Sequence, residues 1–139
     1  MTWRVVIVTR IAPVLAGFDA VVREAGHEPV ALLTKRNVDA RYGPAAEMTD
    51  LLLTVGAEMD VLMPASQKRI ASLLASVEPD LVVCMGFPWK IPPDALAVPR
   101  LGWVNGHPSL LPLHRGPTPI AWAIRDGDEE IGKIGRAHV

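Results

Sequence analysis

Val5-Val6-Ile7-Val8-Thr9 is the stretch of this 139-residue sequence that decides the fold. The run is continuously apolar and rich in β-branched residues, which is typical of a central parallel strand covered on both faces. After a turn at Ile11-Ala12-Pro13, apolar residues recur at helical spacing over positions 14–25, and Gly26 is expected to end that helix. The start of the sequence therefore predicts a strand followed by a helix.

The alternation of strands and helices continues along the chain. Further strands are predicted at Pro29–Thr34, Met59–Met63, Asp80–Met85 and Trp103–His107, and helices at Ala45–Val55, Gln67–Val77 and Pro119–Arg125. Ser66 is expected to cap the helix that begins at Gln67. Such alternation indicates βαβ units with right-handed crossovers. The predicted fold class is therefore α/β, a Rossmann-like open, mostly parallel sheet with helices on both faces and a ligand beyond the carboxyl ends of its strands.

Composition excludes several classes of protein. Hydrophobic residues make up 50% and charged residues 21% of the chain, which is typical of one globular domain. The net charge of −1 gives no overall attraction to nucleic acid or to anionic membranes. No segment reaches the roughly 20 apolar residues of a membrane span, and no signal peptide is evident, so a cytoplasmic protein is expected. Cys84 is the single cysteine and lies in an apolar run, which predicts a buried structural thiol.

The segment from Asn105 to Pro119, NGHPSLLPLHRGPTP, holds too many prolines and glycines for a helix or a central strand. Asn105 and His107 are two apart on an extended backbone, so their side chains share one face, about 6.6 Å apart. An amide there can donate to an oxygen that gains charge in a tetrahedral intermediate, and an imidazole can take the proton that an attacking amine loses. The alternative from the residues alone is a proline-stiffened surface loop with an incidental histidine.

A longer pattern surrounds this pair. Asn105 to Gly116 is followed by PIAWAI at 119–124 and GDEEIG at 127–132, and PDLVV at 79–83 and PRLG at 99–102 precede it. The run resembles the formyltransferase N-terminal domain, the family of methionyl-tRNA and glycinamide ribonucleotide formyltransferases. The pattern of that family is Asn-x-His-x-Ser-Leu-Leu-Pro, then Arg-Gly, a Pro-Ile helix and a Gly-Asp turn.

The resemblance implies a strand order of 3-2-1-4-5 and transfer of a formyl group from 10-formyltetrahydrofolate to a primary amine, without a metal. Asn105 then polarises the formyl carbonyl, and His107 assists proton transfer. The loop after the fourth strand is implied to line the folate pocket, with contacts from Met85, Gly86, Phe87, Pro88 and Ile91. For Phe87 and its neighbour Trp89, the alternative is simple packing of the loop on the sheet.

The resemblance favours initiator methionyl-tRNA as the acceptor, and thus protein biosynthesis and one-carbon metabolism. Two departures bear on this. The turn after the first strand is Thr9-Arg10-Ile11-Ala12-Pro13 instead of the family's Gly-Thr-Pro. In the connection after the second strand, from Lys35 to Pro44, the only basic residues are Lys35, Arg36 and Arg41. The alternatives are an amino sugar or glycinamide nucleotide as acceptor, a formyltetrahydrofolate hydrolase, and a non-catalytic folate-binding module.

The third catalytic residue of the family, an aspartate in a motif ending Asp-Thr-Gly, has no match in this sequence. Asp126 and Asp128 come too early and are assigned to a turn. Residues 1–132 are therefore interpreted as a C-terminally incomplete catalytic, folate-binding domain, and residues 133–139 as a non-native tail. The chain by itself is expected to be inactive and prone to aggregate, with an exposed edge on its fifth strand.

The remaining histidines and tryptophans carry weaker signals. His27 follows Gly26 and is expected to be a surface or capping residue. His107 and His114 are expected to lack the carboxylate or cysteine partners of a metal site. Trp103 and Trp122 are expected to pack. Because no G-x-G-x-x-G follows the first strand, a dinucleotide cofactor is not expected.

Overall fold

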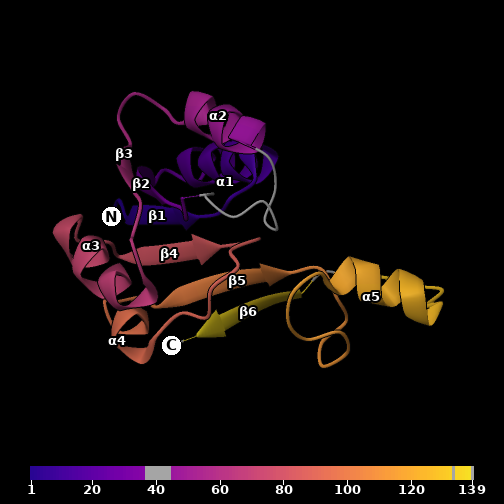
Figure 1. Ribbon diagram of the computed structural model, residues 1–139. Coiled ribbons are helices and arrows are strands. Elements are labelled where there is room, and N and C mark those ends of the chain that lie inside the picture. The colour runs from indigo at the N-terminus through magenta and orange to yellow at the C-terminus, as the bar shows by residue number, and fades with distance from the viewer. Residues whose placement is uncertain (37–44, 133, 139) are drawn as a thin grey trace.

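The protein is a layered α/β structure in the computed structural model, which describes residues 1–36, 45–132 and 134–138 (Figure 1). The strands are β1 (Arg4–Val8), β2 (Glu28–Leu33), β3 (Asp60–Leu62), β4 (Leu81–Cys84), β5 (Trp103–His107) and β6 (Ile134–His138). The helices are α1 (Ala12–Glu24), α2 (Ala45–Thr54), α3 (Ile70–Ser76), α4 (Pro93–Leu96) and α5 (Pro119–Asp126), and a 3₁₀ turn at Gln67–Arg69 leads into α3.

The strand order is β3-β2-β1-β4-β5-β6. The first five strands pair in parallel, which confirms the predicted order of 3-2-1-4-5. β6 pairs antiparallel with β5, from Trp103 opposite His138 to His107 opposite Ile134. The prediction of an exposed edge on the fifth strand is therefore wrong, because residues assigned to a tail supply its neighbour. That residues 133–139 are non-native stays a prediction.

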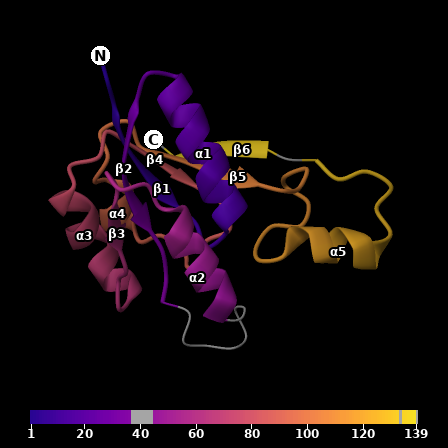
Figure 2. The same cartoon turned by 90° about the horizontal axis from the view of Figure 1, so that it is seen from above.

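Helices cover both faces of the sheet, as predicted (Figures 1 and 2). On one face, α1 and α2 pack over a core cluster of Ile7, Leu15, Leu32, Leu51 and Met59. On the other, α3 and α4 cover a larger cluster that includes Val6, Val8, Leu74, Val82 and Trp103. Because successive residues of β1 point to opposite faces, this strand feeds both clusters and is buried from Val5 to Val8.

Local differences from the sequence prediction have simple causes. α1 begins at Ala12, one residue before Pro13, because proline is well suited to the first turn of a helix. Ser66 lies at the predicted N-cap position, before Gln67, but its side chain makes no capping hydrogen bond. α4 was not predicted, since four residues are too few to show a periodicity. The predicted polar connection from Lys35 to Pro44 lies largely outside the described residues.

Cys84 is buried in the core, as predicted. Burial away from water disfavours the thiolate and raises the pKa of this thiol to about 12. Trp103 also packs as predicted, and its indole Nε1–H donates to the Ala95 carbonyl at 3.1 Å. Trp122 does not: it is 42% exposed, and Arg125 lies over its ring.

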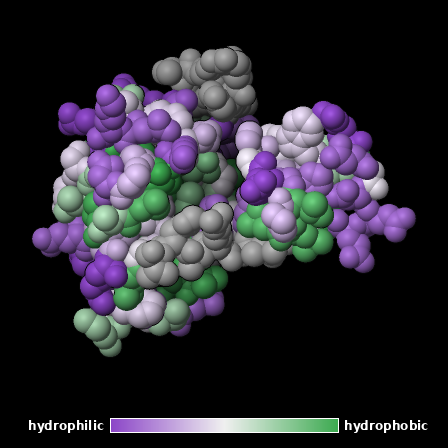
Figure 3. All heavy atoms as spheres, turned by 90° about the horizontal axis from the view of Figure 1, so that it is seen from below, coloured by the Kyte–Doolittle hydropathy of each residue, from purple (hydrophilic) through white to green (hydrophobic). Residues whose placement is uncertain are grey.

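The segment from residue 108 to residue 132, here called the loop–α5 segment, stands apart from the layered body in both ribbon views (Figures 1 and 2). Apolar side chains reach its surface, and Figure 3 shows them on the projecting lobe. The exposed apolar residues of this segment include Leu110, Leu113, Ile120, Trp122, Ile124 and Ile131. Within the described residues, no helix is long and apolar enough to cross a membrane.

Candidate active site

Asn105 and His107 lie at the carboxyl edge of the parallel sheet. Asn105 pairs with Cys84, the last residue of β4, so His107 extends past the end of its neighbour. Strand alternation puts both on the face that holds the buried Trp103, and both are half-buried. An amide and an imidazole thus share one face at the edge where open α/β sheets bind ligands.

The ring of His107 has a defined hydrogen-bond partner. Its Nε2 lies 3.1 Å from the backbone carbonyl oxygen of His114. Because a carbonyl can only accept, Nε2 must carry the hydrogen, and in the neutral ring Nδ1 is then the acceptor. That tautomer suits a base, since Nδ1 has the lone pair that takes up a proton.

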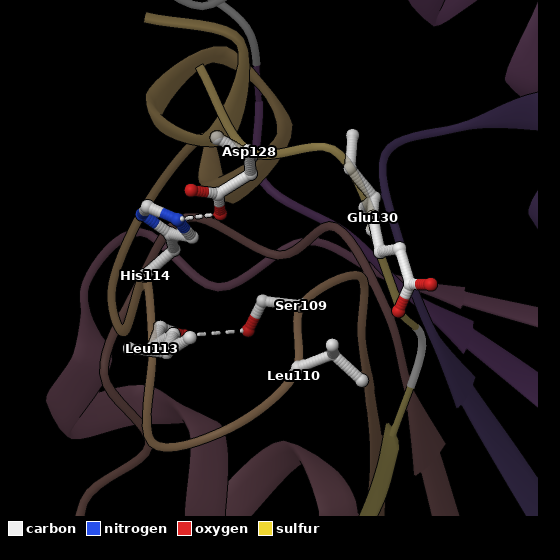
Figure 4. A pocket seen from close by; sticks show the side chains of 8 residues that line it. Ser109, Leu110, Leu113, His114, Asp128 and Glu130 are labelled. Carbon is white, nitrogen blue, oxygen red and sulfur yellow. Dashed lines mark hydrogen bonds and ion pairs between the residues drawn. The ribbon is translucent and has the colours of Figure 1, made fainter. Parts of the chain in front are cut away.

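The loop after His107 closes on itself. The Ser109 N–H donates to the His107 carbonyl at 2.9 Å, and the Leu113 N–H donates to the Leu110 carbonyl at 3.0 Å. The buried Ser109 hydroxyl donates to the Leu113 carbonyl at 2.9 Å (Figure 4). Ser109 is therefore a structural residue, because its hydroxyl is engaged by a carbonyl rather than by a base.

His114 has a carboxylate partner, which corrects the expectation that it has none. Its Nε2 lies 2.6 Å from Asp128 Oδ2 (Figure 4). Its Nδ1 lies 3.9 Å from Asp126 Oδ2. The His114 backbone is left-handed, with φ of 48°, a region that costs a side-chain-bearing residue about 1–2 kcal/mol. No sequence pattern indicates this pair, because the two residues are 14 apart and lie in different segments. Among the described residues, no group of three or more possible ligands is placed to hold a metal ion.

The end of α5 positions Asp128. Gly127 is left-handed, with φ of 74°, and its N–H donates to the Ile124 carbonyl. The Asp128 N–H donates to the Ala123 carbonyl at 3.0 Å, which completes a helix-terminating motif. A cavity of about 20 Å³ between this helix end and the loop has space for one water-sized molecule and is too small for a substrate.

The loop after β4 meets the loop after β1. Gly86 has φ of 71°, a conformation that favours glycine, and a Cβ atom there would displace the end of the Ile11 side chain, whose Cδ1 would lie 2.6 Å away. Met85 lies against Gly106 of β5, while Pro88 is half-buried. The loops that follow three neighbouring strands, β1, β4 and β5, therefore converge at one edge.

The aromatic side chains of the β4 loop pack on the sheet. Phe87 and Trp89 contact edge to face at a centroid distance of 5.9 Å, and both pack with Ile91 against the larger core cluster. Lys35 Nζ lies 5.0 Å from the centre of the Trp89 ring. Both rings thus pack on the sheet, and both stay half-buried.

A second hollow lies at the carboxyl end of β1. It measures about 220 Å³ and is lined by Arg10, Ile11, Ala12, Pro13, Glu47 and Asp50. The Arg10 guanidinium lies 3.8 Å from the Glu47 carboxylate. The Thr9 hydroxyl accepts from the Ile11 N–H at 3.1 Å and fixes the turn. Of the basic residues expected near an acceptor, Arg36 is exposed, and Arg41 lies outside the described residues.

The family model described as Formyl transferase matches residues 5–134. The chain belongs to the formyl transferase family. A methionyl-tRNA formyltransferase from Roseiflexus sp. (strain RS-1) is 36% identical over 137 residues, covering 95% of this chain and 42% of the relative. One from Rhodococcus erythropolis (strain PR4) is 35% identical over 132 residues, covering 93% and 43%. The chain thus spans less than half the length of these relatives.

Solved structures of formyltransferases share the fold. Glycinamide ribonucleotide transformylase 1 from Symbiobacterium toebii matches with a TM-score of 0.74 at 18% identity, over 99% of this chain and 66% of that one. A 4-N formyltransferase from Francisella tularensis matches with a TM-score of 0.70 at 17% identity, over 98% and 50%. At these identities the likeness concerns the fold and not the substrate.

Proposed function

We propose that this chain contributes the donor-binding and catalytic elements of an enzyme that transfers a formyl group from 10-formyltetrahydrofolate to a primary amine. One observation carries the proposal: Asn105 and His107 share one face at the carboxyl edge of the sheet. They lie within the residues that match the formyl transferase family.

The two side chains divide the chemistry of acyl transfer. As the amine nitrogen bonds to the formyl carbon, the Asn105 amide N–H donates to the carbonyl oxygen, which gains negative charge. Nδ1 of His107 accepts the proton that the amine loses. This nitrogen is the acceptor because Nε2 carries the hydrogen that is donated to the His114 carbonyl. Collapse of the tetrahedral intermediate breaks the bond to N10 of the folate, and the proton held by His107 passes to that nitrogen, which regenerates the neutral imidazole.

The loop after β4 is proposed to hold the folate, because it offers an exposed backbone and apolar side chains next to β5. Gly86 is exposed and has no side chain, so its backbone can be approached closely. Met85, Phe87, Pro88 and Ile91 of the same loop are half-buried, and their apolar side chains can contribute a wall. No metal is part of the proposed reaction.

The proposed acceptor is the aminoacyl group of initiator methionyl-tRNA. Relatives at 35–36% identity that match most of this chain are methionyl-tRNA formyltransferases. Lys35 and the exposed Arg36 follow β2 at the same edge of the sheet and can meet phosphates. The ammonium group of Lys35 already lies over the Trp89 ring, so contact with a phosphate would compete with that interaction.

A panel of acceptors tests the proposal. The complete product of the encoding gene is incubated with 10-formyltetrahydrofolate and, in separate reactions, methionyl-tRNA, an amino-sugar nucleotide, glycinamide ribonucleotide or no acceptor. The expected result is formyl transfer to methionyl-tRNA. Folate release without any acceptor would instead identify a hydrolase.

A binding measurement separates an enzyme from a binding module. Isothermal titration with a folate analogue is run on the same protein. Folate binding without transfer to any acceptor would contradict catalysis and favour the non-catalytic module. The 139-residue chain is assayed beside it, since its inactivity in isolation stays a prediction.

A further inference from the structure

A chain of contacts links the end of α5 to the imidazole of His107. The Asp128 carboxylate accepts from His114 Nε2 at 2.6 Å, and the His114 carbonyl accepts from His107 Nε2 at 3.1 Å. The contact to Asp128 was found only from the structure, and the reaction outlined above does not use it. Here Asp128, His114 and His107 are called the histidine relay.

We infer that His114 and Asp128 are positioning residues for His107, an inference that rests on the proposed function. Asp128 holds the His114 ring, the ring holds the His114 backbone, and the His114 carbonyl keeps the hydrogen of His107 on Nε2. Nδ1 of His107 is thereby kept ready to accept a proton. Neither His114 nor Asp128 touches the reacting atoms in this account.

The backbone of His114 explains why a side-chain contact is needed. With φ of 48°, it occupies a region that residues other than glycine rarely adopt unless their surroundings hold them there. The surroundings are specific, because the His114 side chain is only 13% exposed and lies against Asp128. Loss of the carboxylate should let the backbone relax and move the carbonyl away from His107.

Asp128 is well suited to be the fixed end of the relay. Its N–H is bonded to the Ala123 carbonyl, and Ala123 is one of the two buried residues of α5. The carboxylate is thus tied to a helix end rather than to a mobile turn. Asp126 is a natural control, because its carboxylate lies 3.9 Å from the same ring and is 49% exposed.

The first test measures the position of the His107 hydrogen without reference to activity. In the 139-residue chain labelled with ¹⁵N-histidine, the Nε2–H of His107 is expected to be protected from exchange with water. Asp128→Ala and His114→Ala should abolish that protection. Asp128→Asn keeps an acceptor oxygen, so the His107 Nε2–H should stay protected in that variant. The control Asp126→Ala should also leave the protection unchanged.

His114→Gly keeps the test decisive if the alanine variants fail to fold. Glycine adopts φ of 48° without strain, so this variant removes the ring alone. It is expected to weaken the protection of the His107 Nε2–H. Protection that persists in His114→Gly and Asp128→Ala, or that is absent from the unmodified chain, would overturn the inference.

The second test uses turnover in the complete gene product. Asp128→Ala should lower kcat about ten- to hundredfold, as expected for a misplaced catalytic group, with the KM for the folate unchanged. Asp128→Asn should keep most of the kcat of the unmodified protein. An unchanged kcat in Asp128→Ala overturns the positioning role. An inactive unmodified protein in which the His107 hydrogen is nevertheless protected contradicts the proposed function and leaves the relay intact.

Discussion

β1 and the loop–α5 segment are held in place by different forces. The four residues from Val5 to Val8 are at most 1% exposed, and they are fixed by packing against clusters on both faces of the sheet. In the loop–α5 segment, the buried residues are Ser109, Pro119 and Ala123. Its shape depends instead on hydrogen bonds, among them those of Ser109, His114 and Asp128. Packing defines the frame of the protein, and polar contacts define the geometry next to His107.

The difference has consequences for stability. Burying a large apolar side chain contributes about 1.5–3 kcal/mol, and β1 does so on both faces. A hydrogen bond to a charged group contributes about 1.5–3 kcal/mol, and the loop–α5 segment has few of them. Regions with few buried apolar contacts open more easily than the rest of a protein. We therefore expect the segment to open locally while the sheet stays folded.

The largest effect is expected from a pair of identical substitutions in the two regions. Ile7 is fully buried in β1, and Ile124 is 70% exposed on α5. Ile7→Ala should lower the free energy of unfolding by about 2–5 kcal/mol, because it leaves a cavity in the core. Ile124→Ala should change it by less than about 0.5 kcal/mol. Urea unfolding measures the free energy of unfolding of both variants. Similar losses in the two variants would refute the claim that packing stabilises β1 more than the loop–α5 segment.

A smaller effect is expected in acid. The Arg4 backbone N–H and the Arg100 side chain donate to the Asp80 carboxylate and lower its pKa from the ordinary value of 3.8. Since the folded pKa is the lower one, the contact stabilises the fold above pH 3.8, and this stabilisation is lost as the pH falls through the folded pKa. Asp80→Asn should remove that part of the acid dependence.

Acid titrations of the variant and of a matched control measure this contribution. Asp19→Asn changes a carboxylate that pairs with Arg23 on the surface of α1, and it should leave the acid dependence almost unchanged. Identical acid unfolding curves for the unmodified chain and Asp80→Asn would contradict the role given to Asp80.

The smallest effect is expected for chemical labelling of Cys84, which a thiol reagent should not modify in the folded protein. Its thiol is buried and has a pKa of about 12, so the reactive thiolate is scarce at pH 8. Local opening of the loop–α5 segment leaves Cys84 covered, so labelling by a thiol reagent should follow global unfolding. Labelling that is much faster than unfolding would show that the sheet opens together with the segment.

Elements buried in the sheet were predictable from the sequence to within about one residue. β1, β2 and β4 are short apolar runs, as is typical of parallel strands covered on both faces. β6 was not predictable from the sequence, because IGRAH contains no apolar run. This strand arises from pairing with β5.

The candidate site was predictable only in part. The pair Asn105 and His107 could be found because two residues on one strand share a face. The contact between His114 and Asp128 could not, since it depends on where α5 ends relative to a loop 14 residues earlier. Distant polar contacts of this kind leave no periodicity in a sequence.

The most direct test of the central claim compares turnover with folate affinity in the complete gene product. Asn105→Ala and His107→Ala should each lower turnover about a hundred- to a thousandfold, while folate affinity changes little. His27→Ala is the control. His27 stacks on Trp3 and lies just before β2, at the end of the strands opposite to the candidate site. The account predicts a large loss of turnover in the first two variants and near-normal turnover in the third. Near-normal turnover in both Asn105→Ala and His107→Ala would contradict it.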